Sequence, residues 1–292
     1  MNPSADTAEA QEAVTPEAHE REGRRPKRKK KESKYTAHTA DKYELYQHAV
    51  QSPETDIDFV QRVYREINEK EAKHFREDFC GTAILCATWV KSAKDRTAEG
   101  YDLDPEPVDW GKEKNLAPLG DGADRVQIFL EDARSEGVRA PDVRIAQNFS
   151  YWIFKERAVL LDYFKKAHES LAEDGIFLID LWGGSETQDK LREKRKVEEG
   201  FTYIWDQGEY FPASGDFTCK IHFKFQDGTK MKNAFVYDWR VWHLTELRDL
   251  FLEAGFSQVD SYFEDDDNDD EYVLDNQGEH CAAWISYLVG QK

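Results

Sequence analysis

The chain has 292 residues, of which 39% are hydrophobic and 13% aromatic, enough for one large α/β core or two small ones. Its formal net charge is −19, and an acidic body repels phosphate backbones, which argues against duplex nucleic acid as the main substrate. Its four cysteines are scattered without metal-ligand spacing, so we expect reduced thiols, no metal site and a cytoplasmic location. No apolar run approaches the roughly 18 residues of a spanning helix, so we expect a soluble protein without membrane contact.

The first residues of the chain differ in composition from the rest. Residues 1–34 are rich in Ala, Glu, Pro and basic residues and lack apolar periodicity, which predicts a disordered tail. Within it, residues 21–34 carry nine Lys and Arg against two Glu. This run could bind RNA or an acidic surface, but a solvated tail is the simpler interpretation. We expect residues 35–292 to form the folded part.

Helical and strand patterns alternate from about residue 41 onward. Apolar spacing predicts helices at 41–50 and from Ser52-Pro53, before the first strand. Strands are expected at 73–79, 97–103, 124–130, 143–147 and 176–181, with helices at 82–93, after Pro105 and at 156–171. Such alternation is typical of a parallel sheet that is covered by helices on both faces.

An acidic strand end runs into a Cys-Gly-Thr turn within residues 76–83, and an apolar helical run follows. Asp102 lies 21 residues after Gly81 (102 − 81), at the end of the next strand. This gap is close to the roughly 20 residues between the phosphate turn and the ribose acid of nucleotide-binding βαβ units. A glycine turn lets the backbone approach a ligand, and a carboxylate at the next strand end can bind both ribose hydroxyls. Together they predict a nucleoside pocket.

This stretch resembles the class I S-adenosylmethionine-dependent methyltransferases, whose first strand ends in an acid and a Gly-x-Gly-x-Gly-like turn. Cys80-Gly81-Thr82-Ala83 matches the Cys-Gly-Thr-Gly end of that turn, with Ala83 in place of the last glycine and Phe79 in place of the first. Glu77 falls on the usual acid, and Asp78 is a competing choice. One remaining glycine makes a poor cradle for a dinucleotide pyrophosphate, whereas a methyl donor without phosphates needs the glycines less.

The resemblance implies an S-adenosylmethionine site at the strand ends. The residues expected to contact the cofactor are Glu77, Asp78, Cys80, Gly81, Thr82, Asp102, Leu103, Asp132, Ala133 and Asn148. In the family an acid or small polar residue after the third strand bonds the adenine amino group, which makes Asp132 the candidate; a helix N-cap or loop carboxylate is the alternative. A helix before the first strand often closes over the cofactor, so Tyr43, Tyr46 or Gln47 could touch it, although aromatic packing on the sheet edge is the simpler expectation.

The segment after the fourth strand, residues 148–152, would lie beside the reactive methyl group in such a fold. Asn148 or Ser150 could orient a nucleophile through hydrogen bonds, and Tyr151 could attract a cation through its ring face. A loop capped by Asn and packed by aromatic residues is the equal alternative. No convincing base emerges, so the catalytic residues stay unknown, with Asn148, Ser150, Tyr151 and His222 as weak candidates.

Residues after the fifth strand depart from a minimal domain. Residues 185–200 are charged and predicted to be helical, whereas 201–240 alternate as strands. Asp227-Gly228 predicts a two-residue hairpin turn that pairs Phe225 with Lys230 and His222 with Asn233, with Phe235 and Tyr237 on the face opposite Ile221 and Cys219. We interpret about 200–240 as an antiparallel β insertion that covers or shapes the substrate pocket. A lone histidine on a sheet is more often structural than catalytic.

The last third returns to the core. A helix is expected from an N-cap at Thr245 to Gly255, followed by a strand at 256–262. Residues 264–271 are nearly all acidic and are predicted to form a solvated loop. A final strand is expected at 281–289, and in the family this strand is antiparallel and lies between strands five and six.

These patterns predict an α/β fold: a Rossmann-like methyltransferase sheet, mostly parallel with its last strand antiparallel, and an antiparallel β insertion after strand five. The resemblance implies S-adenosylmethionine-dependent methyl transfer by direct displacement to an unidentified acceptor, for which charge favours a small molecule. A non-catalytic methyltransferase-like scaffold and a nicotinamide-dependent oxidoreductase are the alternatives. The sequence does not identify the acceptor or the oligomeric state.

Overall fold

The computed structural model describes residues 34–265 and 268–292. The tail predicted over residues 1–34 lies outside the described residues, except for Lys34. Within these ranges, none of the helices combines the length and apolarity that a bilayer crossing requires.

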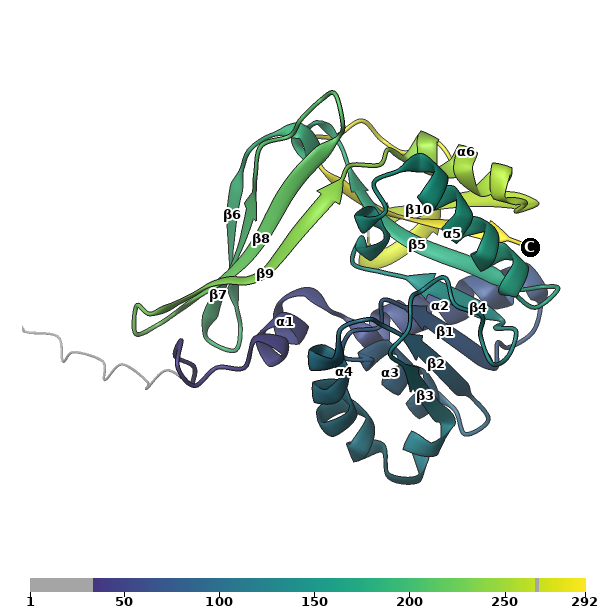
Figure 1. Ribbon diagram of the computed structural model, residues 1–292, viewed down its shortest axis with the longest axis horizontal. Helices are drawn as coiled ribbons and strands as arrows, with labels where there is room; N and C mark the ends of the chain where they lie inside the picture. Colours follow the sequence, from purple (N-terminus) through teal and green to yellow (C-terminus); the bar gives the residue numbers. More distant parts are fainter. Residues whose placement is uncertain (1–33, 266–267) are drawn as a thin grey trace, which may run out of the picture. The chain divides into compact units, whose positions relative to one another are not determined.

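The larger of two sheets has eight strands in the order β11-β10-β12-β5-β4-β1-β2-β3 (Figure 1). Its strands are β1 (His74–Asp78), β2 (Thr97–Tyr101), β3 (Val126–Phe129), β4 (Val143–Ala146), β5 (Ile176–Gly183), β10 (Gln258–Asp265), β11 (Asn268–Leu274) and β12 (Trp284–Gln291). Strands β1 to β5 run parallel, and β12 lies between β5 and β10, antiparallel to both. This arrangement confirms the predicted fold class and the predicted place of the last strand.

Helices cover both faces of the larger sheet. They are α2 (Pro53–Asn68), α3 (Ile84–Ser92), α4 (Pro105–Gly111), α5 (Arg157–Ser170) and α6 (Leu244–Ala254); a further helix, α1 (Lys42–Val50), packs on the second sheet, and short helical turns lie at Lys112–Leu116, Ala117–Arg125, Ser150–Ile153 and Ser185–Gln188. Strand β5 shows why both faces are covered: Ile176 and Leu178 pack in the cluster with α2 and α3, while Phe177 and Ile179 pack in the cluster with α5 and α6. A continuous apolar run needs apolar partners on both sides of the sheet.

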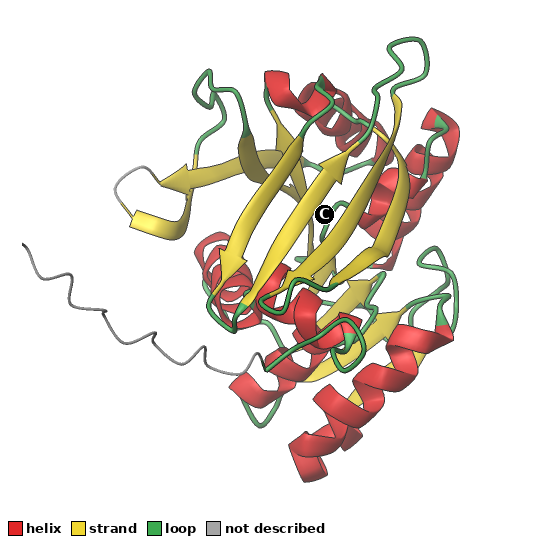
Figure 2. Cartoon of the chain, turned by 90° about the vertical axis from the view of Figure 1, so that its left-hand side faces the viewer, coloured by secondary structure: helices red, strands yellow, loops and turns green. Residues whose placement is uncertain are grey.

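The second sheet is antiparallel and follows β5 (Figure 2). It consists of β6 (Arg192–Val197), β7 (Phe201–Gln207), β8 (Asp216–Phe225) and β9 (Lys230–Arg240), which lie side by side in that order. Its apolar side chains form a core with α1 and Tyr35, in which Leu45 contributes from the helix and Ile221 and Phe223 from β8. The predicted β insertion after strand five is therefore confirmed.

The helix predicted over residues 185–200 is wrong, because only the short turn Ser185–Gln188 is helical and residues 192–197 form strand β6. Five of the six residues of β6 are exposed, so the strand carries no apolar alternation that a sequence pattern could reveal. Its conformation depends on backbone pairing with β7 instead, from Arg192 opposite Asp206 to Val197 opposite Phe201.

The hairpin at Asp227-Gly228 is present with a different register. The Phe225 N–H donates to the Thr229 carbonyl (3.0 Å), and Gly228 has φ +92°, which makes a three-residue turn rather than a two-residue one. Lys224, not Phe225, therefore lies opposite Lys230.

In addition to the register change at the hairpin turn, a bulge between Ile221 and Phe223 shifts the pairing of β8 with β9. Ile221 then lies opposite Phe235, and Cys219 opposite Tyr237, so each pair shares one face of the sheet. The predicted assignment of Phe235 and Tyr237 to the opposite face is wrong for this reason.

Two local predictions near the C-terminus also change. The N-cap of α6 is His243 rather than Thr245, because the His243 N–H donates to Glu246 Oε2 (3.0 Å) in a capping box. The solvated loop predicted over 264–271 is replaced in large part by the β10–β11 hairpin, in which Tyr262 lies opposite Leu274. Backbone pairing at a sheet edge does not require apolar side chains, which is why composition misled the prediction.

Candidate functional site

The strand order reverses between β1 and β4, and the carboxyl ends of the parallel strands meet there. In open α/β sheets this switch point is where ligands bind. The turn around Gly81 follows β1, Asp102 follows β2, Asp132 lies beyond β3 and Asn148 follows β4. The structure therefore brings the residues predicted for the cofactor to one edge of the sheet.

The turn after β1 has left-handed backbone at three alternate positions. The φ angles are +57° at Phe79, +48° at Gly81 and +53° at Ala83. A Cβ added at Gly81 would meet nothing within 4 Å, so open space lies over the turn there. The three angles correspond to the three glycines of the Gly-x-Gly-x-Gly pattern, and the turn keeps that backbone although two positions carry side chains.

Asp102 links the end of β2 to this turn. Its Oδ2 accepts the Gly81 N–H (2.8 Å) and its Oδ1 accepts the Asp104 N–H (2.8 Å). Burial raises the pKa of the Asp102 carboxyl above its ordinary value. The neighbouring Leu103 side chain is 66% exposed, so it projects into solvent.

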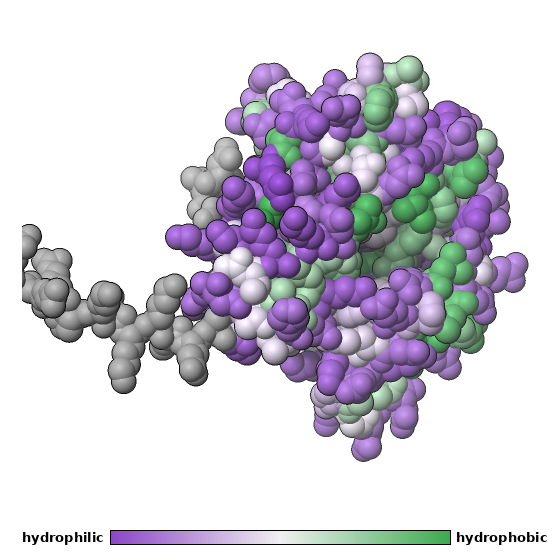
Figure 3. Space-filling model, turned by 60° about the vertical axis from the view of Figure 1, so that its left-hand side comes forward, coloured by the Kyte–Doolittle hydropathy of each residue, from purple (hydrophilic) through white to green (hydrophobic). Residues whose placement is uncertain are grey.

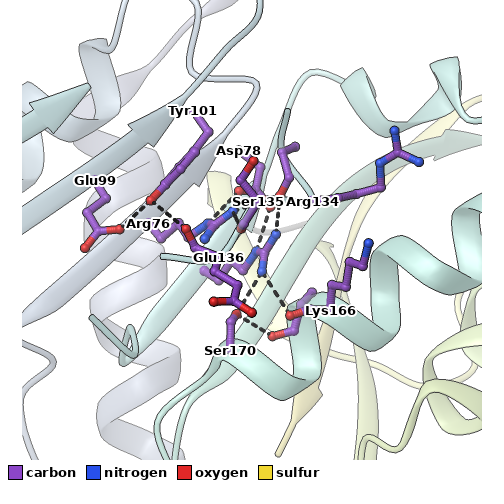
Figure 4. A network of polar contacts seen from close by, with 12 residues as sticks. Arg76, Asp78, Glu99, Tyr101, Arg134, Ser135, Glu136, Lys166 and Ser170 are labelled. Carbon is purple, nitrogen blue, oxygen red and sulfur yellow. Dashed lines mark hydrogen bonds and ion pairs between the residues drawn. The ribbon is translucent and has the colours of Figure 1, made fainter. Parts of the chain in front are cut away.

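The two acids at the end of β1 point to opposite faces of the sheet. Asp78 is fully buried: its Oδ1 accepts Arg76 Nε (2.8 Å), and its Oδ2 accepts Arg144 Nε (2.7 Å) and the Tyr163 hydroxyl (2.7 Å). Both arginines also donate to the Ala133 carbonyl, at 2.8 and 2.6 Å (Figure 4). Asp78 thus fixes the guanidinium groups that hold the loop after β3, and its oxygens are filled by protein donors.

Glu77 lies on the other face, toward α3. Its Oε2 accepts the Cys86 N–H (3.1 Å) near the start of that helix. Burial raises the pKa of the Glu77 carboxyl to about 8. The motif acid therefore braces the helix that follows the turn, and it is largely protonated at neutral pH.

The remaining predicted cofactor residues have protein partners around the crevice. Asp132 accepts Arg134 Nε (2.9 Å) and Nη2 (2.8 Å), which lowers the pKa of its carboxyl, and Ala133 is buried beside it. Thr82 Oγ1 accepts Gln47 Nε2 (3.0 Å), so α1 reaches over the turn. Cys80 is buried, with its N–H donating to the Tyr101 carbonyl (3.0 Å).

The loop after β4 is anchored by one carboxylate. The N–H groups of Asn148 and Phe149 donate to the two oxygens of Asp180, at 2.7 and 3.0 Å, and both residues have φ +57°. Asp180 lies on β5, and burial raises the pKa of its carboxyl to about 7. Left-handed backbone at two consecutive non-glycine residues is costly, and the paired hydrogen bonds to Asp180 offset that cost.

A cavity of about 600 Å³ lies between this loop, the α1–α2 junction and the second sheet. Figure 3 shows a hollow with hydrophobic side chains on this face. Aromatic residues from both sheets and α1 line the cavity: Tyr46, Phe149, Trp182, Tyr203, Trp205, Tyr237, Trp239, Tyr272, Trp284 and Tyr287. Its volume suits a small molecule.

No family model matches the chain, and no curated protein matches it either. Solved structures do. An S-adenosylmethionine-dependent methyltransferase from Clostridium acetobutylicum is 16% identical at a TM-score of 0.63, covering 85% of this chain and 96% of its own. CalS10, an amino pentose methyltransferase from Micromonospora echinaspora, is 15% identical at a TM-score of 0.62, and the match covers 86% of this chain and 97% of CalS10. The sugar N-methyltransferase KedS8 from Streptoalloteichus is 17% identical at a TM-score of 0.60, and the match covers 99% of each chain.

The chain has the class I methyltransferase fold. The resemblance carried by residues 76–83 and Asp102 is thereby confirmed at the level of the fold. In this methyltransferase fold the crevice at the Gly81 turn and the aromatic cavity meet at the loop after β4, since Gln147, Asn148 and Phe149 line the cavity.

Of the four weak catalytic candidates, the structure places one in the cavity lining and the other three outside it. Asn148 lines the cavity, whereas Tyr151 is buried and donates its hydroxyl to the Asp180 carbonyl (2.9 Å). The Ser150 hydroxyl donates to the Gln147 carbonyl (2.8 Å). His222 lies outside the cavity lining: its Nδ1 accepts the Asn233 N–H (2.7 Å) and its Nε2 lies 3.1 Å from Asp206 Oδ2.

Sequence reasoning missed two carboxyls that line the cavity, the half-buried Asp56 and the buried Asp180. Asp180 left a signal, because it interrupts the otherwise apolar run of β5. Asp56 left none, since an acid in the first turn of a helix is ordinary. Among the described residues, no cluster of three or more His, Cys, Asp or Glu is arranged to hold a metal ion.

Proposed function

We propose that the protein is an S-adenosylmethionine-dependent methyltransferase that acts on a small molecule. One observation carries the proposal: Asp102 hydrogen-bonds to the Gly81 turn at the switch point of a methyltransferase-fold sheet. A carboxylate beside an open backbone turn at this switch point supports nucleoside binding there.

The residues of the crevice fit this cofactor. Asp102 is in place for the ribose hydroxyls, and the open face of Gly81 allows close approach. We assign Asp132 and Ala133 to the adenine, and Thr82 and Asn148 to the remaining edge of the cofactor. The turn after β1 keeps one glycine, which makes a poor cradle for a pyrophosphate, whereas a methyl donor without phosphates does not need that cradle, so S-adenosylmethionine fits this crevice better than a dinucleotide.

When bound, S-adenosylmethionine supplies an electrophilic methyl group together with its leaving group. The chain itself has to hold the acceptor in line and exclude water from the site. The aromatic cavity provides the enclosure, and the Asp180-anchored loop lies where cofactor and acceptor would meet. Gln47 holds α1 against Thr82, so this helix serves as a cover.

Calorimetric titration of the purified protein with S-adenosylmethionine, S-adenosylhomocysteine and NADH tests the proposal. We expect saturable binding of the first two and none of NADH. Binding of NADH alone would replace the proposal with a nicotinamide-dependent function. Binding of both adenosyl compounds, without methyl transfer to any member of a broad small-molecule panel, would favour a scaffold role.

A further inference from the structure

The charged residues of the aromatic cavity are mostly acidic. Its lining includes the carboxyl groups of Asp56, Asp180, Glu186, Glu193 and Glu264 against one basic residue, Arg195. Arg195 donates a hydrogen bond to the Ala49 carbonyl of α1, so a protein acceptor already offsets part of its positive charge. An anionic ligand would be repelled from such a cavity, and a cation would be attracted.

Two of these carboxyls, the half-buried Asp56 and the buried Asp180, have no ion-pair partner among the described residues. Asp56 accepts the Tyr287 hydroxyl (2.9 Å), and Asp180 accepts only backbone N–H groups near the cavity. The Asp56 charge contributes to the raised pKa of Asp180, so the two groups lie close enough to interact. A buried carboxylate without a counter-charge is costly, and a ligand cation would offset that cost.

The walls around these carboxyls are ring faces. Tyr237 and Trp239 stack with their ring centroids 4.3 Å apart on β9, and the ring of Trp205 on β7 lies edge-on to that of Trp182, with centroids 5.9 Å apart. Aromatic faces attract desolvated cations, above all tryptophan. Carboxylates combined with aromatic walls are the chemistry that recognises an ammonium group.

We propose that this cavity binds the ammonium group of the methyl acceptor, which makes the substrate a small amine. The inference rests on the proposed function. A neutral alcohol or thiol would leave Asp56 and Asp180 without a counter-charge, and a carboxylate or phosphate would add to the repulsion. A protonated amine can pair with the carboxylates and is attracted to the aromatic ring faces.

Methylation of an ammonium group first requires loss of a proton, since a protonated nitrogen has no lone pair. Asp180 receives that proton, which its pKa near neutrality allows. The nitrogen lone pair then forms the bond to the methyl carbon, while sulfur keeps the electron pair of the broken carbon–sulfur bond. The products are a methylated ammonium and a neutral thioether.

Choline and its neutral carbon isostere, 3,3-dimethylbutan-1-ol, provide the test at pH 8, where the two carboxyls are ionised. The readout is calorimetry together with quenching of the cavity tryptophans in the full chain. We expect choline to bind at least about tenfold more tightly than the isostere. Equal affinities for the two compounds, or no binding of either, would overturn the inference.

Variants locate the site. Asp56→Asn retains an acceptor for Tyr287, and Trp205→Leu removes one aromatic wall; each should reduce the preference for choline severalfold. Asp180→Asn loses one of two backbone acceptors and can disturb the loop, so it is the weaker choice. The control Glu253→Gln alters an exposed carboxylate paired with Arg157 and should keep the preference. An unchanged preference in both Asp56→Asn and Trp205→Leu would contradict the assignment to this cavity.

Failure of the inference is distinct from failure of the proposed function. If S-adenosylmethionine binds and the choline preference is absent, the amine inference falls and the methyltransferase proposal stands. If choline is preferred but neither adenosyl compound binds, the methyltransferase proposal falls, and the amine loses its role as methyl acceptor.

Discussion

Phe79 and Ala83 have the backbone of glycines without being glycines. For an L residue the left-handed region costs roughly 1–2 kcal/mol, so something must hold these positions. The Phe79 ring packs against Phe154 and Tyr163, with centroids 5.7 and 5.9 Å away, and the Ala83 N–H donates to the Cys80 carbonyl (2.7 Å). Ring packing at Phe79 and a turn hydrogen bond at Ala83 therefore hold the left-handed backbone that glycine would adopt without strain.

Replacing Ala83 by glycine tests this strain. Ala83→Gly loses a buried methyl and gains unfolded-state entropy, but it relieves the left-handed backbone, so we expect a change of less than about 0.5 kcal/mol in the free energy of unfolding. Ala87 is the fourth residue of helix α3 and has ordinary helical backbone. Ala87→Gly therefore loses a methyl without relieving any backbone strain, and it should lower the free energy of unfolding by about 1 kcal/mol or more. Denaturant unfolding of both variants measures the difference. Equal losses would show that Ala83 is not strained.

Asp102 is the residue on which the cofactor proposal depends most. Asp102→Ala should weaken S-adenosylmethionine binding by roughly 1.5–3 kcal/mol, as expected for lost hydrogen bonds to a charged group. Calorimetry of a variant with an unchanged circular dichroism spectrum measures this loss. The exposed Asp109→Ala, one helix away, serves as the control and should bind normally. Wild-type affinity in Asp102→Ala would rule out the ribose assignment.

At the scale of elements, the bulge between β8 and β9 decides which side chains face the cavity. Asn233 has φ +52° at the bulge, and its N–H donates to His222 Nδ1 (2.7 Å). Because Nδ1 accepts, Nε2 carries the proton and donates to Asp206 Oδ2 (3.1 Å). His222 is thereby a structural residue that satisfies the bulge and positions Tyr237 on the inner face of the second sheet.

His222→Ala should therefore destabilise the second sheet. The Asn233 N–H loses its acceptor, and the loss of such a hydrogen bond costs about 0.5–1.5 kcal/mol. Thermal unfolding and amide exchange of β8 and β9 measure this effect, while S-adenosylmethionine affinity should stay unchanged. His280→Ala, at an exposed position, is the matched control. A variant of wild-type stability that binds the cofactor poorly would instead point to a role for His222 in the site.

At the scale of the whole molecule, three carboxyls around the site are buried or half-buried without an ion-pair partner among the described residues. Burial raises the pKa of Asp56 to about 6, of Asp180 to about 7 and of Glu77 to about 8. In the unfolded chain these groups titrate near pH 4. At these three groups the folded state therefore binds more protons than the unfolded chain between those values, so their contribution to stability falls as pH rises from about 4 to about 8.

Glu77→Gln isolates the largest of these shifts. Gln resembles the protonated acid, so the variant and the wild type should have similar melting temperatures near pH 5.5. At pH 8.5 the wild type carries the buried charge and should melt several degrees lower than the variant. Glu253→Gln, at an exposed carboxyl, should keep the wild-type pH dependence. A parallel pH dependence of Glu77→Gln and wild type would show that Glu77 is not buried as a neutral acid.

The central sheet could be predicted because its information is local. The apolar run of β5, the Cys-Gly-Thr turn and the spacing from Gly81 to Asp102 each lie within a short stretch, and a right-handed alternation of strands and helices leaves few ways to assemble them. The parallel sheet and the convergence of the cofactor candidates at one edge followed from these signals, whereas the place of β12 was implied by the resemblance to the methyltransferase family.

The β insertion was expected to shape a pocket, but the lining of the aromatic cavity could not be predicted, because its residues are far apart in the chain. Asp56 from α2, Asp180 from β5 and Trp205 from β7 come together only when the second sheet and α1 close over the strand ends. The exposed strand β6 and the bulge beside His222 depend on pairing with neighbouring strands, which leaves no periodic pattern. Local propensity and spacing determined the fold and the cofactor edge, whereas long-range packing alone decided which side chains face the acceptor.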